Sequence, residues 1–284
     1  MKPFNVTLIR PEGTVHVQAL LEAAEYLHYA VMRAGYASVL STNRIYADTH
    51  NIVLNGHLLT DRHLEELPAD TILFNSEQLV NKDGWYFKGA YRQLIKKFFV
   101  WDYSLRNMAE IDHARKFHIP FLFCPELMRA KTPRGNDGLL YFYGIMTERR
   151  KRLMQALRDE GVQSEWLFGK YAAERDALIF NAWAVLNISH TEAIGTFEPI
   201  RCFYPLINGI PVISETSSDP TYDLYKDYLF TFTARNLARG VAELYRDKAA
   251  FEQAAAEKAA AFRATSSADA LAKAVAFYRD SLSL

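Results

Sequence analysis

The chain has 284 residues, half of them hydrophobic, and its 33 lysines and arginines balance its 33 aspartates and glutamates. This length suits two modest domains or one large one, each with a real hydrophobic core. A net charge of about zero argues against a dedicated nucleic-acid-binding protein, which would normally carry a basic excess. Two cysteines are too few for a disulfide framework, so we expect a reducing compartment.

The N-terminus and the hydropathy of the chain favour a cytoplasmic protein. The first residues, MKPFNVTLIRPEG, lack the apolar core of a secretory signal peptide. No apolar run reaches the roughly 18–20 residues that span a bilayer. Residues 86–99 mix aromatic and basic side chains and could rest on anionic lipid, or form an ordinary packed helix with a solvated basic edge. Peripheral contact with the inner face of the membrane therefore stays open.

Apolar strands and amphipathic helices alternate along the first 124 residues. In chain order, the predicted strands cover 6–9, 37–41, 51–55, 71–74, 98–102 and 119–124, and the predicted helices cover 17–34, 85–97 and 105–117. Gly35 stops the first helix as a C-cap residue. This rhythm predicts an α/β fold, in which helices cover both faces of a parallel sheet.

Residues 125–138 break the rhythm, because prolines, glycines and charges replace the hydrophobic period. After this linker, strands are predicted over 139–144, 164–169, 184–189, 211–214 and 228–233, and helices over 147–160, from 172, over 197–208 and in the Ala-rich tail 247–284. We therefore expect two domains, 1–130 and 139–284, the second including the helical tail. A single large doubly wound domain is the alternative.

A polar cluster follows the buried strand 184–189. His190 and Glu192 lie in the loop, and Glu198 and Arg201 fall in the first turn of the next helix. Ligands of open α/β sheets bind beyond the carboxyl ends of the strands. A helix N-terminus there also offers free N–H groups and a positive dipole end to an anion such as a diphosphate.

This stretch resembles the sugar-nucleotide half of GT-B glycosyltransferases. Their pattern is an acidic loop, a Glu on a helix, and Gly-x-Pro-Val leading into a strand; here it reads Glu192, Glu198 and GIPV over 209–212. The sequence departs from the common retaining pattern, because more residues separate Glu198 from Gly209 and the loop has Ala-Ile-Gly over 193–195 instead of Gly-Phe-Gly.

The resemblance implies two Rossmann-like domains with parallel sheets that face each other across a cleft. Residues 1–130 would bind the acceptor, and residues 139–284 would bind the nucleotide sugar. Glu198 would then accept hydrogen bonds from the ribose hydroxyls, and Arg201 would pair with Glu198 or reach the diphosphate. His190 and Glu192 would line the site near the sugar. The plainer alternatives are an i,i+3 ion pair for Glu198 and an ordinary loop position for His190.

Two further loops of the second half carry donor-site candidates. Gly144 permits a tight turn and the close approach of a ligand. Arg149, like its neighbour Arg150, lies in a first helical turn where a cation opposes the helix dipole, so an anion would relieve the conflict; a solvated basic helix face is the alternative. The resemblance places the nucleobase around 168–171, where Lys170 and Tyr171 lie, although Lys170 also fits an ordinary surface lysine.

An inverting enzyme would also need a general base in the first half. His16 follows the first strand, Glu77 follows the strand at 71–74, and Asp102 ends the strand at 98–102. A helix N-terminus keeps imidazole neutral, and partial burial raises the proton affinity of carboxylates, so each type can accept a proton. The alternatives are a helix-start residue for His16 and caps for the carboxylates. His57 is a weaker fourth candidate.

The motifs that the chain lacks exclude further classes of enzyme. The chain has no Asp-x-Asp, no zinc-ligand spacing, no Gly-x-Gly-x-x-Gly and no Walker A loop. We expect a metal-independent glycosyltransferase without a cofactor. It would move a sugar from a nucleotide-sugar co-substrate to a hydroxyl of a glycan, glycolipid or other polysaccharide precursor. We expect no nucleic-acid partner. The rivals are a nucleotide-sugar epimerase and a non-catalytic nucleotide-sugar-binding module.

Overall fold

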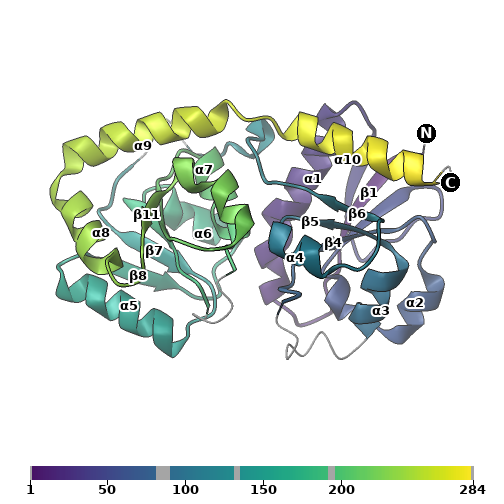
Figure 1. The fold of residues 1–284 in the computed structure, drawn as a ribbon, viewed down its shortest axis with the longest axis horizontal. Coiled ribbons are helices and arrows are strands. Elements are labelled where there is room, and N and C mark those ends of the chain that lie inside the picture. Colours follow the sequence, from purple (N-terminus) through teal and green to yellow (C-terminus); the bar gives the residue numbers. More distant parts are fainter. Residues whose placement is uncertain (1, 81–89, 131–134, 191–195, 283–284) are drawn as a thin grey trace. The chain divides into compact units, whose positions relative to one another are not determined.

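The computed structural model describes residues 2–80, 90–130, 135–190 and 196–282. The chain forms two compact units: unit 1 is Met1–Glu126 with Ser266–Leu284, and unit 2 is Leu127–Thr265. Each unit contains one parallel sheet with packed helices (Figure 1). The predicted α/β fold with two parallel sheets is confirmed, and a single continuous sheet is excluded. In the described parts, no helix is long and apolar enough to cross a membrane.

Unit 1 is built on a six-stranded sheet of order β2-β1-β3-β4-β5-β6. The strands β1, β3, β4 and β5 are buried along their whole length, as expected for parallel strands covered on both faces. Its strands are β1 (Phe4–Leu8), β2 (Ser38–Thr42), β3 (His50–Leu54), β4 (Ile72–Asn75), β5 (Phe99–Asp102) and β6 (Lys116–His118). Its helices are α1 (Leu21–Arg33), α2 (Asp61–Glu66), α3 (Ala90–Lys97), α4 (Leu105–Glu110) and α10 (Ser267–Leu282), with the short 3-10 helices η1 (His16–Leu20) and η2 (Gly56–Leu58).

Unit 2 repeats this plan with five strands in the order β11-β10-β9-β7-β8. Read in chain order, both sheets have the 2-1-3-4-5 arrangement of doubly wound folds, although the two halves share no sequence repeat. Its strands are β7 (Leu140–Tyr143), β8 (Ser164–Leu167), β9 (Ala184–Asn187), β10 (Val212–Glu215) and β11 (Phe230–Phe232). Its helices are α5 (Glu148–Asp159), α6 (Ala172–Ile179), α7 (Phe203–Ile207), α8 (Leu237–Arg246) and α9 (Lys248–Arg263), with 3-10 turns at η5 (Pro199–Arg201), η6 (Pro220–Leu224) and η7 (Lys226–Tyr228); η4 (Pro125–Leu127) lies at the boundary of the units.

The helix predicted over 105–117 is wrong beyond Glu110, where α4 ends. The ammonium of Lys116 donates to the carbonyls of Met108 and Ile111 at 2.7 and 2.6 Å, which satisfies backbone groups at the end of the helix. Strand β6 follows and begins at Lys116, three residues before the start of the strand predicted at 119–124.

Residues 119–124 form no strand, because Pro120 lacks the N–H that a ladder needs. The buried Tyr26 hydroxyl replaces the missing sheet contacts. It donates to the carbonyl of Pro120 and accepts from the N–H of Leu122, both at 2.9 Å.

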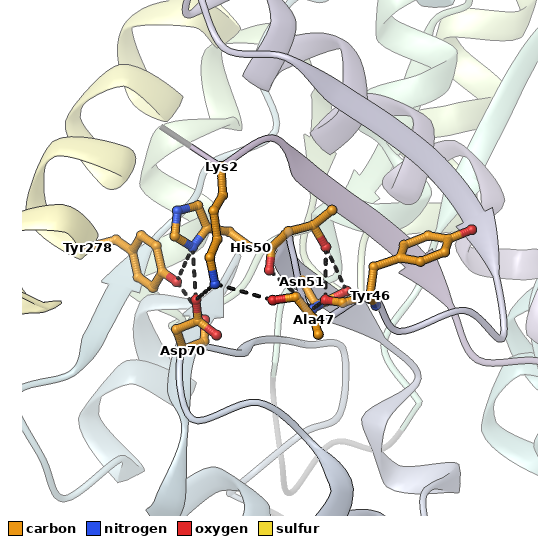
Figure 2. Close-up of polar contacts among 8 residues, drawn as sticks. Lys2, Tyr46, Ala47, His50, Asn51, Asp70 and Tyr278 are labelled. Atoms are coloured by element: carbon orange, nitrogen blue, oxygen red, sulfur yellow. Dashed lines mark hydrogen bonds and ion pairs between the residues drawn. The ribbon is translucent and has the colours of Figure 1, made fainter.

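The C-terminal helix α10 packs in unit 1, which differs from the expected second domain of 139–284. Tyr278 is fully buried, and its ring meets that of Phe99 edge-on at 4.9 Å between centroids. Its hydroxyl donates to the carbonyl of Asp70 at 2.5 Å and lies 3.0 Å from Nδ1 of His50, as Figure 2 shows. Lys2 joins the same group through the Asp70 carboxylate at 3.8 Å. The pattern of apolar residues predicts a helix here but not which sheet the helix covers.

The helix predicted over 197–208 is divided into η5 and α7. Pro205 has no N–H to donate to the carbonyl of Arg201, four residues earlier. The Tyr143 hydroxyl donates to that carbonyl instead, at 2.8 Å. Past α7, Asn208 accepts from the N–H groups of Arg129 and Ala130 at 2.6 and 2.9 Å, so the start of the predicted linker is fixed to unit 2.

Candidate functional site

The order of the strands identifies where a ligand should bind in each unit. In doubly wound sheets the crevice opens at the switch point, where connections leave in opposite directions. This point lies between β1 and β3 in unit 1 and between β7 and β9 in unit 2. The loops that begin at Gly144 and Ile188 therefore flank the switch point of unit 2, and they carry most of the predicted donor-site residues.

Arg149 is held by Glu215, the last residue of β10. The two side chains form a bidentate pair, and one guanidinium nitrogen also donates to the carbonyl of Ser189 at 3.1 Å. Glu215 in turn accepts from the N–H of Ser189 at 2.7 Å. Since both side chains are largely buried, this pair fixes the loop after β9 to the first turn of α5, and most of the charge of Arg149 is compensated within the protein.

Arg150 is buried to 98%, and carbonyl groups rather than a carboxylate hold it. Its guanidinium donates to the carbonyls of Ile145 at 2.5 Å and Ile188 at 2.8 Å, and lies over the ring of Phe142 at 5.0 Å. Burial and the neighbouring Arg201 charge lower the pKa of Arg150 to about 9. Its cation is therefore destabilised by burial, and an anion would stabilise it.

Arg201 also reaches the switch point through neutral acceptors. It donates to Oδ1 of Asn187 at 2.8 Å and to the carbonyl of Ile188 at 3.1 Å. Within the described parts of the chain, neither Arg150 nor Arg201 forms an ion pair with a carboxylate. Two guanidinium groups thus donate to neutral groups of adjacent loops at this edge of the sheet.

Gly144 lies between these two arginines. A methyl group added at this position would come within 3.7 Å of both Nη1 of Arg150 and Nε of Arg201. The backbone of Gly144 has a φ of +140°, which side-chain-bearing residues rarely adopt. The glycine therefore leaves the space beside the two guanidinium groups free of a side chain.

Glu198 and His190 lie within electrostatic range of the same arginines. The Glu198 side chain is mostly buried, and its charge raises the pKa of Arg150 against the effect of burial. His190 is exposed as a whole, but part of its ring is buried. This partial burial lowers its pKa most, and the charges of Arg150 and Arg201 lower it further. Glu192 lies outside the described residues.

The loop after β8 provides exposed apolar surface beside Gly144. The indole N–H of Trp166 donates to the carbonyl of Gly144 at 2.9 Å, and the Phe168 ring lies 5.0 Å from the indole. Phe168 is 60% exposed, which is unusual for a large aromatic side chain. Of the predicted residues in this loop, Lys170 is exposed, and Tyr171 precedes α6 and is half-buried, which raises its pKa.

In unit 1, Asp102 is fully buried at the end of β5. Its carboxylate accepts from the side chain of Asn75 at 2.6 Å, from the N–H of Ser104 at 2.7 Å and from the side chain of Asn107 at 3.4 Å. A carboxylate that accepts these three hydrogen bonds holds the loops after β4 and β5 together. It has little access to an acceptor.

Glu77 lies above this network and is partly accessible, with 24% of its side chain exposed. Its Oε1 is 3.0 Å from Nδ1 of His57, which follows β3. Burial lowers the pKa of His57 to about 4, so the ring is neutral at pH 7. The third base candidate, His16, begins η1 and is exposed.

Sequence reasoning missed Glu215 and preferred Arg149 to Arg150. Glu215 ends a strand that the pattern predicts to stop at Ser214, and its role depends on the packing of α5 against the sheet. The sequence places both arginines in the same helical turn but does not show which one a carboxylate neutralises. No cluster of three or more His, Cys, Asp or Glu side chains with metal-binding geometry occurs among the described residues.

No family model matches the chain. The chain is 29% identical over 163 residues to uncharacterized protein L140 of Acanthamoeba polyphaga mimivirus, which covers 55% of this chain and 52% of that protein. It is 25% identical over 195 residues to uncharacterized protein L138 of the same virus, which covers 66% of this chain and 22% of that protein. The chain therefore spans about half, or less, of the length of these curated relatives.

Solved structures are similar over nearly the whole chain. A DNA-modifying beta-glucosyltransferase matches with a TM-score of 0.61 at 12% identity, covering 97% of this chain and 99% of that one. AviGT4, a glycosyltransferase of avilamycin A biosynthesis, matches with a TM-score of 0.60 at 14% identity, covering 99% and 97%. T4 phage BGT in complex with UDP and Mn²⁺ matches with a TM-score of 0.58 at 13% identity, covering 97% and 99%.

Two doubly wound parallel sheets with polar side chains at their switch points define a pair of Rossmann-like units. The neighbours identify the arrangement as the GT-B fold of glycosyltransferases, which confirms the fold that the resemblance at residues 187–215 predicts. Identities of 12–14% establish the fold alone, so the activity has to be argued from the site.

Proposed function

We propose that the protein is a glycosyltransferase that binds the diphosphate of a nucleotide sugar at Arg150 and Arg201. The observation that carries this proposal is the pair of guanidinium groups beside the backbone of Gly144, which donate to neutral acceptors alone among the residues that the structure describes. Buried cations without a counterion are costly, and arginine binds phosphate oxygens through two parallel hydrogen bonds. A diphosphate would add its negative charge to that of the nearby Glu198.

The other side chains at this edge suit the rest of the donor. Glu198 is suited to accept hydrogen bonds from ribose hydroxyls, and His190 would lie near the sugar. The exposed Phe168 and half-buried Tyr171 offer an apolar surface for a nucleobase, which backbone groups of the same loop would recognise. Arg149 orders this site through Glu215 and reaches the diphosphate only by leaving that pair.

The chemistry we propose is attack of an acceptor hydroxyl on the anomeric carbon of the sugar. The bond to the diphosphate breaks, and Arg150 and Arg201 stabilise the charge that develops on the leaving group. In an inverting reaction Glu77 accepts the hydroxyl proton. Its partial exposure favours it over the buried Asp102, and its fixed surroundings favour it over the exposed His16. A retaining reaction would need no such base.

The net charge of the chain bears on the nature of the acceptor. A zero net charge supports a glycan or lipid-linked acceptor rather than a nucleic acid. However, one structural neighbour is a DNA-modifying enzyme, so duplex DNA belongs in any acceptor screen. We also propose that the protein is cytoplasmic and that transfer needs neither a metal ion nor a cofactor.

The test begins with a thermal-shift screen of UDP, ADP, GDP and CDP. A ligand present at many times its Kd stabilises the folded protein by a few kcal/mol, so the correct nucleotide should raise the Tm of unit 2. The corresponding nucleotide sugar is then incubated without acceptor, which reveals an epimerase, and with glycan, lipid and DNA acceptors. Binding without turnover under every condition would favour a non-catalytic module.

A further inference from the structure

We propose that Asn187 is a positioning residue, whose side-chain oxygen holds the guanidinium group of Arg201 in place for a diphosphate without neutralising its charge. This inference rests on the proposed function, in which Arg201 binds the diphosphate of the donor. It assigns a role to the last residue of β9, at the switch point of unit 2.

The neighbours of Asn187 allow only one orientation of its amide. Nη1 of Arg201 donates to Oδ1 of Asn187 at 2.8 Å, and a guanidinium group has no acceptor, so the oxygen has to face it. The amide nitrogen then faces Ser214, its register partner on β10, and donates to the hydroxyl at 3.0 Å. The hydroxyl donates its single proton to the carbonyl of Glu215 at 3.0 Å. The donors therefore run in one direction, from Arg201 to the end of β10.

Burial keeps this arrangement rigid. Asn187 is 5% exposed and Ser214 is fully buried. A buried polar group that loses its partner costs free energy, so a rotated amide, which would set two donors against each other, is excluded. The backbones of the two residues are fixed as well, because they are paired in the parallel ladder of β9 and β10. The amide oxygen is therefore a fixed acceptor at the end of β9.

The position of this acceptor brings two cations together. Nη1 of Arg201 also donates to the carbonyl of Ile188 at 3.1 Å, and the same carbonyl accepts from Nη2 of Arg150 at 2.8 Å. Two guanidinium groups thus meet at one carbonyl oxygen, although like charges repel each other. Asn187 holds Arg201 in this place, beside Gly144, where one anion can contact both groups.

The neutrality of the amide is as important as its position. Arg149 shows the alternative, because the carboxylate of Glu215 holds it and compensates its charge. An aspartate in place of Asn187 would hold Arg201 equally well but would form the same kind of ion pair. An asparagine orients the cation and leaves its charge for a ligand. This distinction between position and charge provides the test.

The first variant is Asn187→Asp, which keeps the shape of the side chain and an oxygen for Arg201 but adds a negative charge. The Ser214 hydroxyl can turn its proton toward the new carboxylate. We therefore expect a Tm at least equal to that of the wild type. We expect diphosphate binding to weaken by at least about tenfold, because the carboxylate competes for Arg201 and repels the ligand.

Asn136→Asp is the matched control for the added charge. Asn136 is exposed and precedes β7, at the opposite end of the sheet from Asn187. Its Oδ1 accepts from the N–H of Gly138 at 2.9 Å, and a carboxylate can accept the same bond. This variant changes the net charge equally, and its affinity for a diphosphate should equal that of the wild type.

The second variant is Ser214→Ala, which removes the acceptor of the amide nitrogen and leaves every charge in place. Since a hydrogen bond of this kind contributes about 0.5–1.5 kcal/mol, equivalent to about twofold to tenfold in affinity, binding should weaken by a factor in that range. In the Arg201→Met background the same substitution should have no effect on binding, because the group that the amide positions is absent.

Calorimetric titration with UDP, ADP, GDP, CDP and inorganic pyrophosphate measures the affinities, and thermal unfolding gives the Tm of each variant. Wild-type affinity in Asn187→Asp would overturn the inference. An equal loss on Ser214→Ala with and without Arg201 would also overturn it, since the amide would then be purely structural. If Arg201→Met weakens binding and neither Asn187→Asp nor Ser214→Ala does, the inference fails and the proposed function stands. If none of the five probes binds to the wild type, both fail.

Discussion

At the scale of single residues, the hydrogen bonds of Arg150 and Arg201 to neutral acceptors distinguish the candidate donor site from an ordinary sheet edge. Arg149 shows the contrast within one helical turn, since Glu215 neutralises it. A buried ion pair is weak evidence for function because it can be purely structural. A buried guanidinium held by carbonyl groups retains its need for an anion, and this need makes the site testable.

Glu198 gives the first prediction at this scale. Its mostly buried carboxylate can accept strong hydrogen bonds from the ribose, and removal of the charge should weaken nucleotide binding by about 1–3 kcal/mol. Calorimetric titration of Glu198→Gln with the nucleotide found in the screen measures this effect. Unchanged affinity in a variant that keeps the wild-type Tm would refute the role of Glu198.

The second prediction at this scale concerns His57, and it is a dependence of folding stability on pH. Its pKa falls from an unfolded value of about 6.5 to about 4 in the folded protein, so below pH 6.5 the unfolded chain binds a proton that the folded protein does not. The free energy of unfolding should therefore decrease as pH falls from 6.5 to 4, by about 2 kcal/mol between pH 7 and pH 5.

Urea titrations of wild type and His57→Asn at pH 7 and pH 5 measure this term as the difference between the two proteins. The variant lacks the titrating ring and should lose correspondingly less stability at pH 5. A wild type that instead gains stability relative to the variant at pH 5 would mean that the Glu77 carboxylate, rather than burial, controls the proton affinity of His57.

At the scale of elements, α10 shows how a terminal helix can complete the core of unit 1. Tyr278 buries its ring among β-sheet residues and directs its hydroxyl to the carbonyl of Asp70 (Figure 2). Tyr278→Phe removes this hydroxyl and leaves Asp70 and His50 short of a partner, so unit 1 should lose about 1–3 kcal/mol of stability. Urea unfolding tests this, and a variant as stable as the wild type would contradict the account.

The same scale shows what sequence patterns can predict. Hydrophobic runs correctly predict the strands from β1 to β5 and from β7 to β11. Central strands such as β3, β4 and β9 give a clear signal because a parallel strand in the middle of the sheet is buried on both faces, whereas the edge strands β2 and β8 are more exposed. They misplace β6, since Lys116 ends α4 through its side chain and Pro120 blocks the next ladder. The division between η5 and α7 depends on the same lack of an N–H, at Pro205.

The candidate site was predictable in part for a similar reason. Loops at the carboxyl ends of strands follow from the β/α rhythm, so Gly144, Arg149, Glu198 and Arg201 could be located in advance. Partners within the site could not, because the pairing of Arg149 with Glu215 and of Glu77 with His57 joins residues that are far apart in the sequence and that only the fold brings together. Local sequence contains no signal for such contacts.

At the scale of the whole molecule, two units of the same strand order divide the roles that we propose, with the donor in unit 2 and the acceptor in unit 1. Because arginines would neutralise the diphosphate, EDTA should leave transfer unaffected. Transfer assays with EDTA and with added Mg²⁺ or Mn²⁺ test this directly. An absolute requirement for either ion would show that a metal site supplements the arginines, and T4 phage BGT has been observed with UDP and Mn²⁺.

The most direct test of the central claim is calorimetric titration of nucleoside diphosphates into wild type, Arg201→Met and the exposed control Arg152→Met. At least one of UDP, ADP, GDP and CDP should bind to the wild type. Because hydrogen bonds to charged groups contribute about 1.5–3 kcal/mol, Arg201→Met should weaken that binding by at least about tenfold, and Arg152→Met should not. Failure of all four nucleotides to bind, or equal affinity in Arg201→Met, would contradict the account.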